Sequence, residues 1–121
     1  MIRGVRGAIT TDANTEEAII EAAMEILSAM ISANGLHEDD VASIFFTTTP
    51  DLTTAYPARG ARRLGWTKTA LMGGVEMDVV GSIPRCIRVL IHWNTDKPLD
   101  EIKHIYLRDA VKLRPDWSAN T

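Results

Sequence analysis

The chain has 121 residues, 45% of them hydrophobic and 24% charged, which are the size and composition of one globular domain spanning 1–121. Its net charge is −3, and nine of its 13 basic residues are arginine, so a Lys-rich nucleic-acid-binding domain is not expected. Because the chain has no apolar run of membrane-spanning length, no signal-peptide core near Met1 and a single cysteine, Cys86, we expect a cytoplasmic protein without an internal disulfide.

The first predicted strand, residues 2–10, carries an arginine between a valine and a glycine. Glycines inside a strand mark a bulge or a close approach of the backbone. Because Gly7 has no side chain, we expect room for a ligand beside the guanidinium group of Arg6. The alternative is an arginine that faces solvent at the edge of the sheet.

A long helix is predicted to begin at Asn14 or Thr15, either of which can accept hydrogen bonds from the first free backbone N–H groups. Apolar residues at three- and four-residue spacing continue to about Ala33, and Gly35 supplies the C-terminal stop. Residues 12–40 hold eight acidic residues and no Lys or Arg, so the outer side of this helix is expected to be a solvated acidic surface.

A second strand is predicted over residues 41–48, and Pro50 follows its end. A short helix is predicted over residues 56–65, with Pro57 in its first turn and a glycine at its exit. An aromatic residue and three arginines recur at helical spacing and can share a face: Tyr56, Arg59, Arg62 and Arg63. Such a face either meets a flat anion or is solvated charge.

The fourth predicted strand, residues 85–93, is mostly apolar or β-favouring, with Arg88 at its centre. A guanidinium group stays charged and is expensive to bury without an anion. We therefore expect either an internal carboxylate or a bound anion beside Arg88. A third predicted strand begins at 69–72, is loosened by the glycines at 73–74 and is followed by Glu76. Glu76 is expected either to be the internal partner of Arg88 or to bind a substrate hydroxyl.

The C-terminal part is predicted to add one helical turn within residues 99–103 and a short last strand at 104–107. Tyr106 has an apolar residue on each side, so its hydroxyl is expected either to enter a pocket or to belong to a cross-strand aromatic contact. From about residue 115 we expect a flexible tail.

The sequence contains no recognisable motif for metal, nucleotide or covalent chemistry. Its three histidines have no metal-ligand spacing with Cys86, and residues 3–7 fit neither a P-loop nor a GxGxxG pattern. No Ser-His-Asp or Cys-His arrangement is recognisable either. Arginines without such motifs suit a reaction that needs only orientation and charge.

An ordered set of short motifs resembles the AroH-class chorismate mutases: RGVRGA at 3–8, TPDL at 49–52, YPA at 56–58, CIRV at 86–89, HIYL at 104–107 and LRPD at 113–116. The resemblance extends from residue 2 to about residue 116. It implies an α+β fold in which a mixed β-sheet of about five strands packs against one long and one short helix, and three chains form a pseudo-barrel homotrimer.

The resemblance also implies the Claisen rearrangement of chorismate to prephenate, in phenylalanine and tyrosine biosynthesis, with no cofactor, metal, nucleic acid or membrane partner. By the resemblance, Arg88 lies at the ether oxygen of the substrate, Arg6 binds a carboxylate, and Glu76 accepts a hydrogen bond from the ring hydroxyl. Further residues are expected to form the substrate site: Tyr56, Arg59, Arg62, Leu71, Met72, Gly73, Tyr106, Leu113 and Arg114.

In the family, the side of the site that holds Tyr56 and Arg62 comes from the neighbouring subunit, so we expect the sites at subunit interfaces. One departure is Gly73, where the family often has a small thiol or hydroxyl. We expect activity to survive with lower substrate affinity, because Glu76 can hold the ring hydroxyl alone. The alternative function is a non-catalytic trimeric binder or sensor of small aromatic-pathway carboxylic acids.

Overall fold

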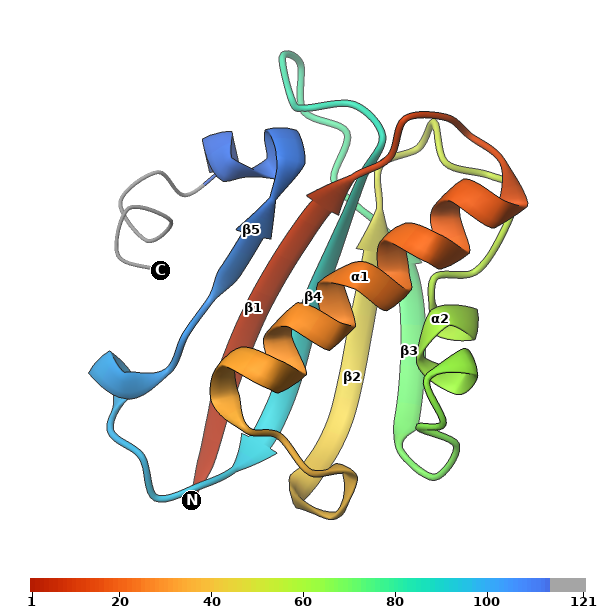
Figure 1. The fold of residues 1–121 in the computed structure, drawn as a ribbon. Helices are drawn as coiled ribbons and strands as arrows, with labels where there is room; N and C mark the ends of the chain where they lie inside the picture. Colours follow the sequence, from red (N-terminus) through yellow and green to blue (C-terminus); the bar gives the residue numbers. More distant parts are fainter. Residues whose placement is uncertain (114–121) are drawn as a thin grey trace.

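The structure, a computed structural model, describes residues 1–113, which form a five-stranded sheet with the helices on one side of it (Figure 1). The strands are β1 (Ile2–Thr10), β2 (Val41–Thr48), β3 (Ala70–Val75), β4 (Cys86–Asn94) and β5 (Ile105–Leu107). The helices are α1 (Glu16–Asn34) and α2 (Ala58–Arg63), and 3₁₀ turns cover Glu38–Asp40, Leu99–Glu101 and Arg108–Leu113. The predicted α+β class, with about five strands and one long and one short helix, is confirmed.

The sheet is mixed, and its strand order is β3-β2-β4-β1-β5. Strand β4 runs antiparallel to both β1 and β2, whereas the outer strands β3 and β5 run parallel to their neighbours. β4 is therefore the central strand. Within it, Arg88 is paired with Ala8 of β1 on one side and with Thr47 of β2 on the other.

Helix α1 has the predicted caps at both ends. The Thr15 hydroxyl accepts a hydrogen bond from a backbone N–H of the first turn at 3.1 Å. The helix ends at Gly35, whose φ of 67° is in the left-handed region that favours glycine. Of the two predicted N-caps, Thr15 is used, and Asn14 instead binds the loop after β2 by accepting from the backbone N–H of Thr53 at 2.9 Å.

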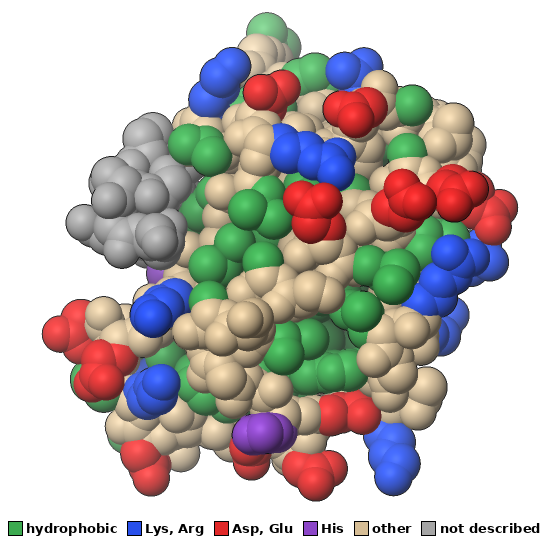
Figure 2. Space-filling view, in the orientation of Figure 1, with side chains coloured by type: hydrophobic (Ala, Val, Ile, Leu, Met, Phe, Trp, Pro, Cys, Tyr) green, Lys and Arg blue, Asp and Glu red, His purple; other side chains and the backbone are tan. Residues whose placement is uncertain are grey.

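The acidic residues of α1 lie on its solvent side, as predicted (Figure 2). Two of them pair with arginines from other elements: Glu16 lies 2.8 Å from Arg59, and Glu25 lies 3.1 Å from Arg108. All four side chains are at least 37% exposed, so each pair contributes at most about 1 kcal/mol. Among the described residues, no helix is long and apolar enough to cross a bilayer.

The two faces of the sheet differ in what covers them. Because side chains alternate along a strand, one set points toward α1 and forms the core, which includes Val5, Ile9, Ile44, Phe46, Ile87, Val89 and Ile91 together with Ile19, Ile26 and Leu27 of the helix. The helices lie on this side of the sheet (Figure 1). We call the opposite side the Arg88 face and define it by Arg6, Ala8, Thr47, Arg88 and Leu90.

Gly7 makes room for the helix rather than for a ligand. A Cβ atom at this position would lie 2.3 Å from Sδ of Met30 and 3.1 Å from Cγ1 of Ile26. The missing side chain therefore lets α1 approach β1 closely, on the side opposite to the Arg6 side chain. The prediction that Gly7 opens space beside Arg6 is wrong for this reason.

Candidate active site

Arg88 lies at the centre of the sheet, but its side chain is only partly buried, with 30% exposed. Its chain neighbours Ile87 and Val89 point to the other face and join the core. The guanidinium therefore does not lie among the aliphatic residues that precede and follow it in the sequence. On its own face Arg88 is flanked across the strands by Ala8 and Thr47, so a polar partner can reach it.

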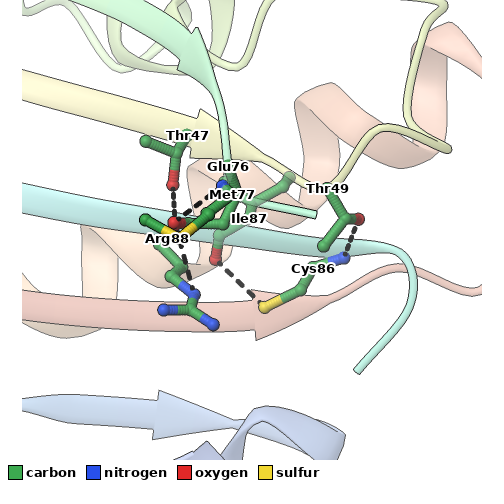
Figure 3. A network of polar contacts seen from close by, with 7 residues as sticks. All are labelled: Thr47, Thr49, Glu76, Met77, Cys86, Ile87 and Arg88. Atoms are coloured by element: carbon green, nitrogen blue, oxygen red, sulfur yellow. Dashed lines mark hydrogen bonds and ion pairs between the residues drawn. The ribbon is translucent and has the colours of Figure 1, made fainter. Parts of the chain in front are cut away.

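Glu76 is the negative partner that the protein itself supplies. It follows β3 directly, where its backbone N–H donates to the carbonyl of Thr48 at 2.7 Å. Its Oε2 atom lies 3.5 Å from Nε of Arg88 (Figure 3). The same oxygen accepts a hydrogen bond from the Thr47 hydroxyl at 2.8 Å, and Oε1 accepts one from the backbone N–H of Met77 at 3.2 Å. Of the two roles expected for Glu76, the pairing with Arg88 is observed.

The surroundings of Glu76 favour its charged form. Burial raises the pKa of its carboxyl, but nearby donors and cations outweigh this effect, and the net pKa is lowered from its ordinary value. The lowering comes from the Thr47 hydroxyl, then the Met77 N–H, then the charges of Arg88 and Arg6. At neutral pH Glu76 is therefore a carboxylate that accepts hydrogen bonds and a poor proton donor.

Glu76 engages only one edge of the Arg88 guanidinium. The contact is made by Nε, which has no hydrogen bond at this distance. The terminal nitrogens are directed away from Glu76 (Figure 3), and the guanidinium also interacts with the Cys86 thiol, where it acts to lower the thiol pKa against the effect of burial. Because a guanidinium carries five N–H donors, the internal partner leaves most of them for a bound anion.

Arg6 and Tyr106 reach the same face from neighbouring strands. Arg6 lies on β1 two residues before Ala8, which is paired with Arg88. The charge of Arg6 contributes to the lowered pKa of Glu76. Tyr106 of β5 is paired with Ala8 from the other side and is 5% exposed. Two arginines, a tyrosine and a carboxylate therefore gather on one face, as the resemblance implies.

A small apolar cluster on the Arg88 face consists of Ala8, Cys86, Tyr106 and Ala110, with Leu113 packed against it. Burial raises the pKa of the Cys86 thiol in spite of the nearby Arg88 charge, so this cysteine packs and is a poor nucleophile. Within residues 1–113, no three His, Cys, Asp or Glu side chains gather in a way that could hold a metal ion. Arg114 and the tail predicted from about residue 115 lie outside the described residues.

A cavity of about 440 Å³, apart from the residues of the Arg88 face, is lined by Tyr56, Arg59 and Gly73. Its wall includes Thr48, whose side chain alternates with that of Thr47 and so points away from the Arg88 face. Tyr56 is 78% exposed, so its ring is available to another molecule. The guanidinium of Arg59 forms an ion pair with Glu16 of α1 at 2.8 Å.

Three predicted site residues belong to neither group. Arg62 is exposed on α2, and no hydrogen bond or ion pair joins its side chain to the part of the chain that the structure describes. Leu71 packs against the hydrophobic core, and Met72 is 63% exposed beside its partner Phe45 on β2. Within the single chain, the predicted site is therefore divided into a group on the Arg88 face and a group on the helix side of the sheet.

Thr47 is not among the residues predicted for the site. A threonine inside a β-favouring run gives no signal of its own, because such residues are common in strands. The usable signal was the alternation in β2: Phe46 is buried in the core, so Thr47 must point to the other face. Only the register that pairs Thr47 with Arg88 brings its hydroxyl to Glu76.

The fold and the site together define a class: a small α+β protein whose mixed sheet presents two arginines, a tyrosine and a carboxylate on the face away from its helices. Residues 2–117 match the family described as chorismate mutase type I, and the chain belongs to that family. The resemblance drawn from the short motifs is therefore confirmed.

Similar proteins match over nearly their whole length. Chorismate mutase AroH of Thermus thermophilus is 50% identical over 117 residues, which are 96% of this chain and 96% of that protein. Chorismate mutase AroH of Bacillus subtilis is 42% identical over 119 residues, 98% of this chain and 94% of that one. A solved chorismate mutase structure from Clostridium thermocellum is 50% identical, with a TM-score of 0.88 over 89% of this chain and 96% of that chain.

Proposed function

We propose that this chain converts chorismate to prephenate by a Claisen rearrangement, as a step in phenylalanine and tyrosine biosynthesis. The observation that carries the proposal is the Arg88 guanidinium, which is oriented by Glu76 while its terminal nitrogens face away from that carboxylate. Family membership supports the same reaction. A cytoplasmic location belongs to the proposal, because the single cysteine is a buried free thiol.

The reaction suits a site built from fixed charges. It is a concerted shift, so it needs no covalent intermediate with the enzyme. As the C–O bond breaks, negative charge develops on the ether oxygen, and a cation held there stabilises the transition state more than the ground state. Arg88 is proposed for this place, because strands on both sides hold its backbone and little reorganisation is needed when the charge appears.

Orientation of the substrate is the second contribution. Chorismate carries two carboxylates, and Arg6 and Arg88 are proposed to bind the one on its side chain, with the Tyr106 phenol in support. Glu76 is proposed to accept from the ring hydroxyl, which its ionised state allows. Holding the enolpyruvyl side chain folded over the ring removes an entropic part of the barrier. Leu113 and Arg114 are proposed to close over the bound substrate.

We infer that the complete site forms between subunits of a homotrimer. Tyr56 and Arg59 line a cavity on the side of the sheet away from Arg88, so a single protomer does not bring both groups to one substrate. A neighbouring subunit is proposed to supply this second group, together with Arg62 and the segment 71–73. Large apolar side chains on and next to the Arg88 face are available for contact between subunits: Phe45 is 38%, Met72 63% and Met77 76% exposed.

The function is tested by adding chorismate to the purified full-length protein and following the loss of its conjugated-diene absorbance. Turnover that is lost in Arg88→Ala supports the proposal. A folded protein that shows no turnover at micromolar concentration overturns it.

The second candidate is a non-catalytic trimeric binder of aromatic-pathway acids, and Gly73 is the observation that favours it. This position offers only backbone in the cavity beside Tyr56 and Arg59. Calorimetry distinguishes the two functions, because a sensor binds chorismate or prephenate tightly and leaves chorismate unconverted.

A further inference from the structure

We propose that Thr47 is a positioning residue of this site, whose hydroxyl fixes the Glu76 carboxylate in the orientation that meets Arg88 and a substrate hydroxyl. The role of Glu76 toward substrate rests on the proposed function. The role of Thr47 toward Glu76 rests on the geometry of the three side chains alone.

The backbone next to Glu76 contacts its side chain through one bond, from the N–H of Met77 to Oε1 at 3.2 Å, and leaves Oε2 to be held by other groups. Glu76 is the first residue after β3, and the loop that follows is exposed, with Met77 76%, Val79 55% and Val80 101% exposed. The hydrogen bond from its N–H to Thr48 holds the main chain and leaves the side-chain torsions free. A glutamate loses considerable rotamer freedom when it is fixed, so a specific contact must select one orientation.

Thr47 supplies that contact from a well-ordered place. It lies within β2 and is paired with Arg88 of the central strand, so hydroxyl and guanidinium stand side by side across the ladder. Its β-branched side chain has few χ1 rotamers, which sets the position of the hydroxyl oxygen. Oε2 of Glu76 lies 2.8 Å from the Thr47 hydroxyl oxygen and 3.5 Å from Nε of Arg88 (Figure 3).

The orientation of Glu76 in turn decides which edge of Arg88 is free. Its carboxylate lies at the Nε edge, and Nε has no other ionic partner within residues 1–113. With the carboxylate held there, the terminal nitrogens stay directed toward the space that a substrate would fill. If Glu76 could rotate, its negative charge could instead approach the terminal nitrogens and compete with the substrate for them.

Thr47 also acts on the charge of Glu76. Burial works against ionisation of this carboxyl, and the Thr47 hydroxyl is the largest of the contacts that offset it. A variant that keeps the shape of Thr47 and lacks the hydroxyl should therefore raise the pKa of Glu76 as well as free its side chain.

Three variants separate these effects. Thr47→Val keeps the size and β-branching and removes the donor, whereas Thr47→Ser keeps the donor. Thr69→Val is the matched control, because the Thr69 hydroxyl donates to a carboxylate oxygen of Glu38 at the same 2.8 Å, before the other end of β3. For each protein, kcat and KM for chorismate are measured across the pH range, and the Glu76 carboxyl is titrated by ¹³C NMR, with its signal assigned from Glu76→Gln.

We expect Thr47→Val to raise KM and to lower kcat/KM by roughly 10- to 100-fold, the range for loss of a hydrogen bond to a charged group. The acid limb of its pH profile and the titration of its Glu76 carboxyl should both move to higher pH. Thr47→Ser and Thr69→Val should retain the wild-type acid limb and the wild-type titration.

A Thr47→Val protein whose Glu76 titrates as in the wild type overturns the inference, and so does an unchanged KM with an unchanged acid limb. A lower melting temperature with no shift in the titration would mean that Thr47 is merely structural, which also overturns it. If the wild type does not convert chorismate, the proposed function fails, while the NMR titration still decides what Thr47 does to Glu76.

Discussion

Glu76 and Arg88 meet through a single edge: Oε2 lies 3.5 Å from Nε, and the terminal nitrogens are directed elsewhere (Figure 3). An ion pair that served stability alone would use the planar fork of the guanidinium, because two parallel hydrogen bonds are stronger than one contact. The partial engagement therefore orients the cation and keeps its strongest donor edge for a ligand.

Replacing Arg88 should damage catalysis far more than folding. Loss of a donor that faces developing negative charge costs roughly 10²–10³ in rate, so Arg88→Ala should lower kcat by at least this factor. Arg88→Lys should recover only part, because an ammonium group keeps the charge without the fork. Steady-state kinetics with chorismate measure the effect, and circular dichroism checks the fold.

Arg63→Ala is the control, since this arginine is exposed on α2 and is not among the residues proposed to contact the substrate. Its kcat should equal that of the wild type. An Arg88→Ala protein with wild-type kcat would contradict the assignment.

The pH dependence follows from the lowered pKa of Glu76. No proton transfer is needed, so kcat/KM should be flat around neutrality and should fall only below the ordinary glutamate pKa of about 4.3. The stability of the fold should depend on pH in the same direction. Because folding lowers the pKa of Glu76, its carboxylate stabilises the fold at pH values above the unfolded-state pKa, and this stabilisation is lost as the pH falls through the folded-state pKa. Urea unfolding of wild type and Glu76→Gln should differ at neutral pH and converge in acid. A sharp bell-shaped rate profile near neutrality would count against this mechanism.

Much of the fold could be predicted because its signals are local. The caps at Thr15 and Gly35 lie next to the helix that they delimit, and the strands at 2–10 and 41–48 begin and end as predicted. The short helix was predicted too long, since Ala58–Arg63 alone is helical and its flanks are turns. Neighbouring residues in sequence determine such features, so no knowledge of strand pairing is required.

The site depends on contacts between distant segments, and there the sequence misled. Arg88 lies between Ile87 and Val89 in the sequence, but adjacent side chains of a strand point to opposite faces. The hydrogen bond between Thr47 and Glu76 joins residues 29 apart, and it exists only because β2 lies between β3 and β4. Arg6, Glu76, Arg88 and Tyr106 are predicted for one site because the ordered motifs resemble a family, since their spacing in the sequence does not indicate that they share one face of the sheet.

Asn34 is expected to be a stability determinant that also holds the Tyr106 strand. Its buried side chain donates to the carbonyl of Lys103 and accepts from the N–H of Lys103, both at 2.9 Å, and it also donates to Met30. Asn34→Ala would leave these backbone groups without partners, at a cost of about 2–3 kcal/mol. Urea unfolding at equal protein concentration measures the loss.

Asn14→Ala is the comparison, because Asn14 also binds a distant loop but does so at an exposed position. It should cost about 1 kcal/mol or less, since water can replace the lost partners. Equal costs for the two variants would show that burial does not decide the value of the Asn34 contacts.

A site shared between subunits predicts that two inactive variants restore each other. Arg88→Ala removes the group on the sheet, and Arg62→Ala removes a residue of the group proposed to come from the neighbour. In a closed ring of three with random mixing at equal amounts, roughly one site in four combines an intact Arg88 with an intact neighbouring Arg62, so co-refolded subunits should regain activity.

Mixing Arg88→Ala with Glu76→Gln is the control. These two residues meet within one chain, so only a site with both wild-type residues on the same chain could work, and mixing creates none. Recovery in the first mixture without recovery in the second would locate the boundary between subunits inside the active site, whereas failure of both mixtures to exceed their separate activities would contradict the shared site.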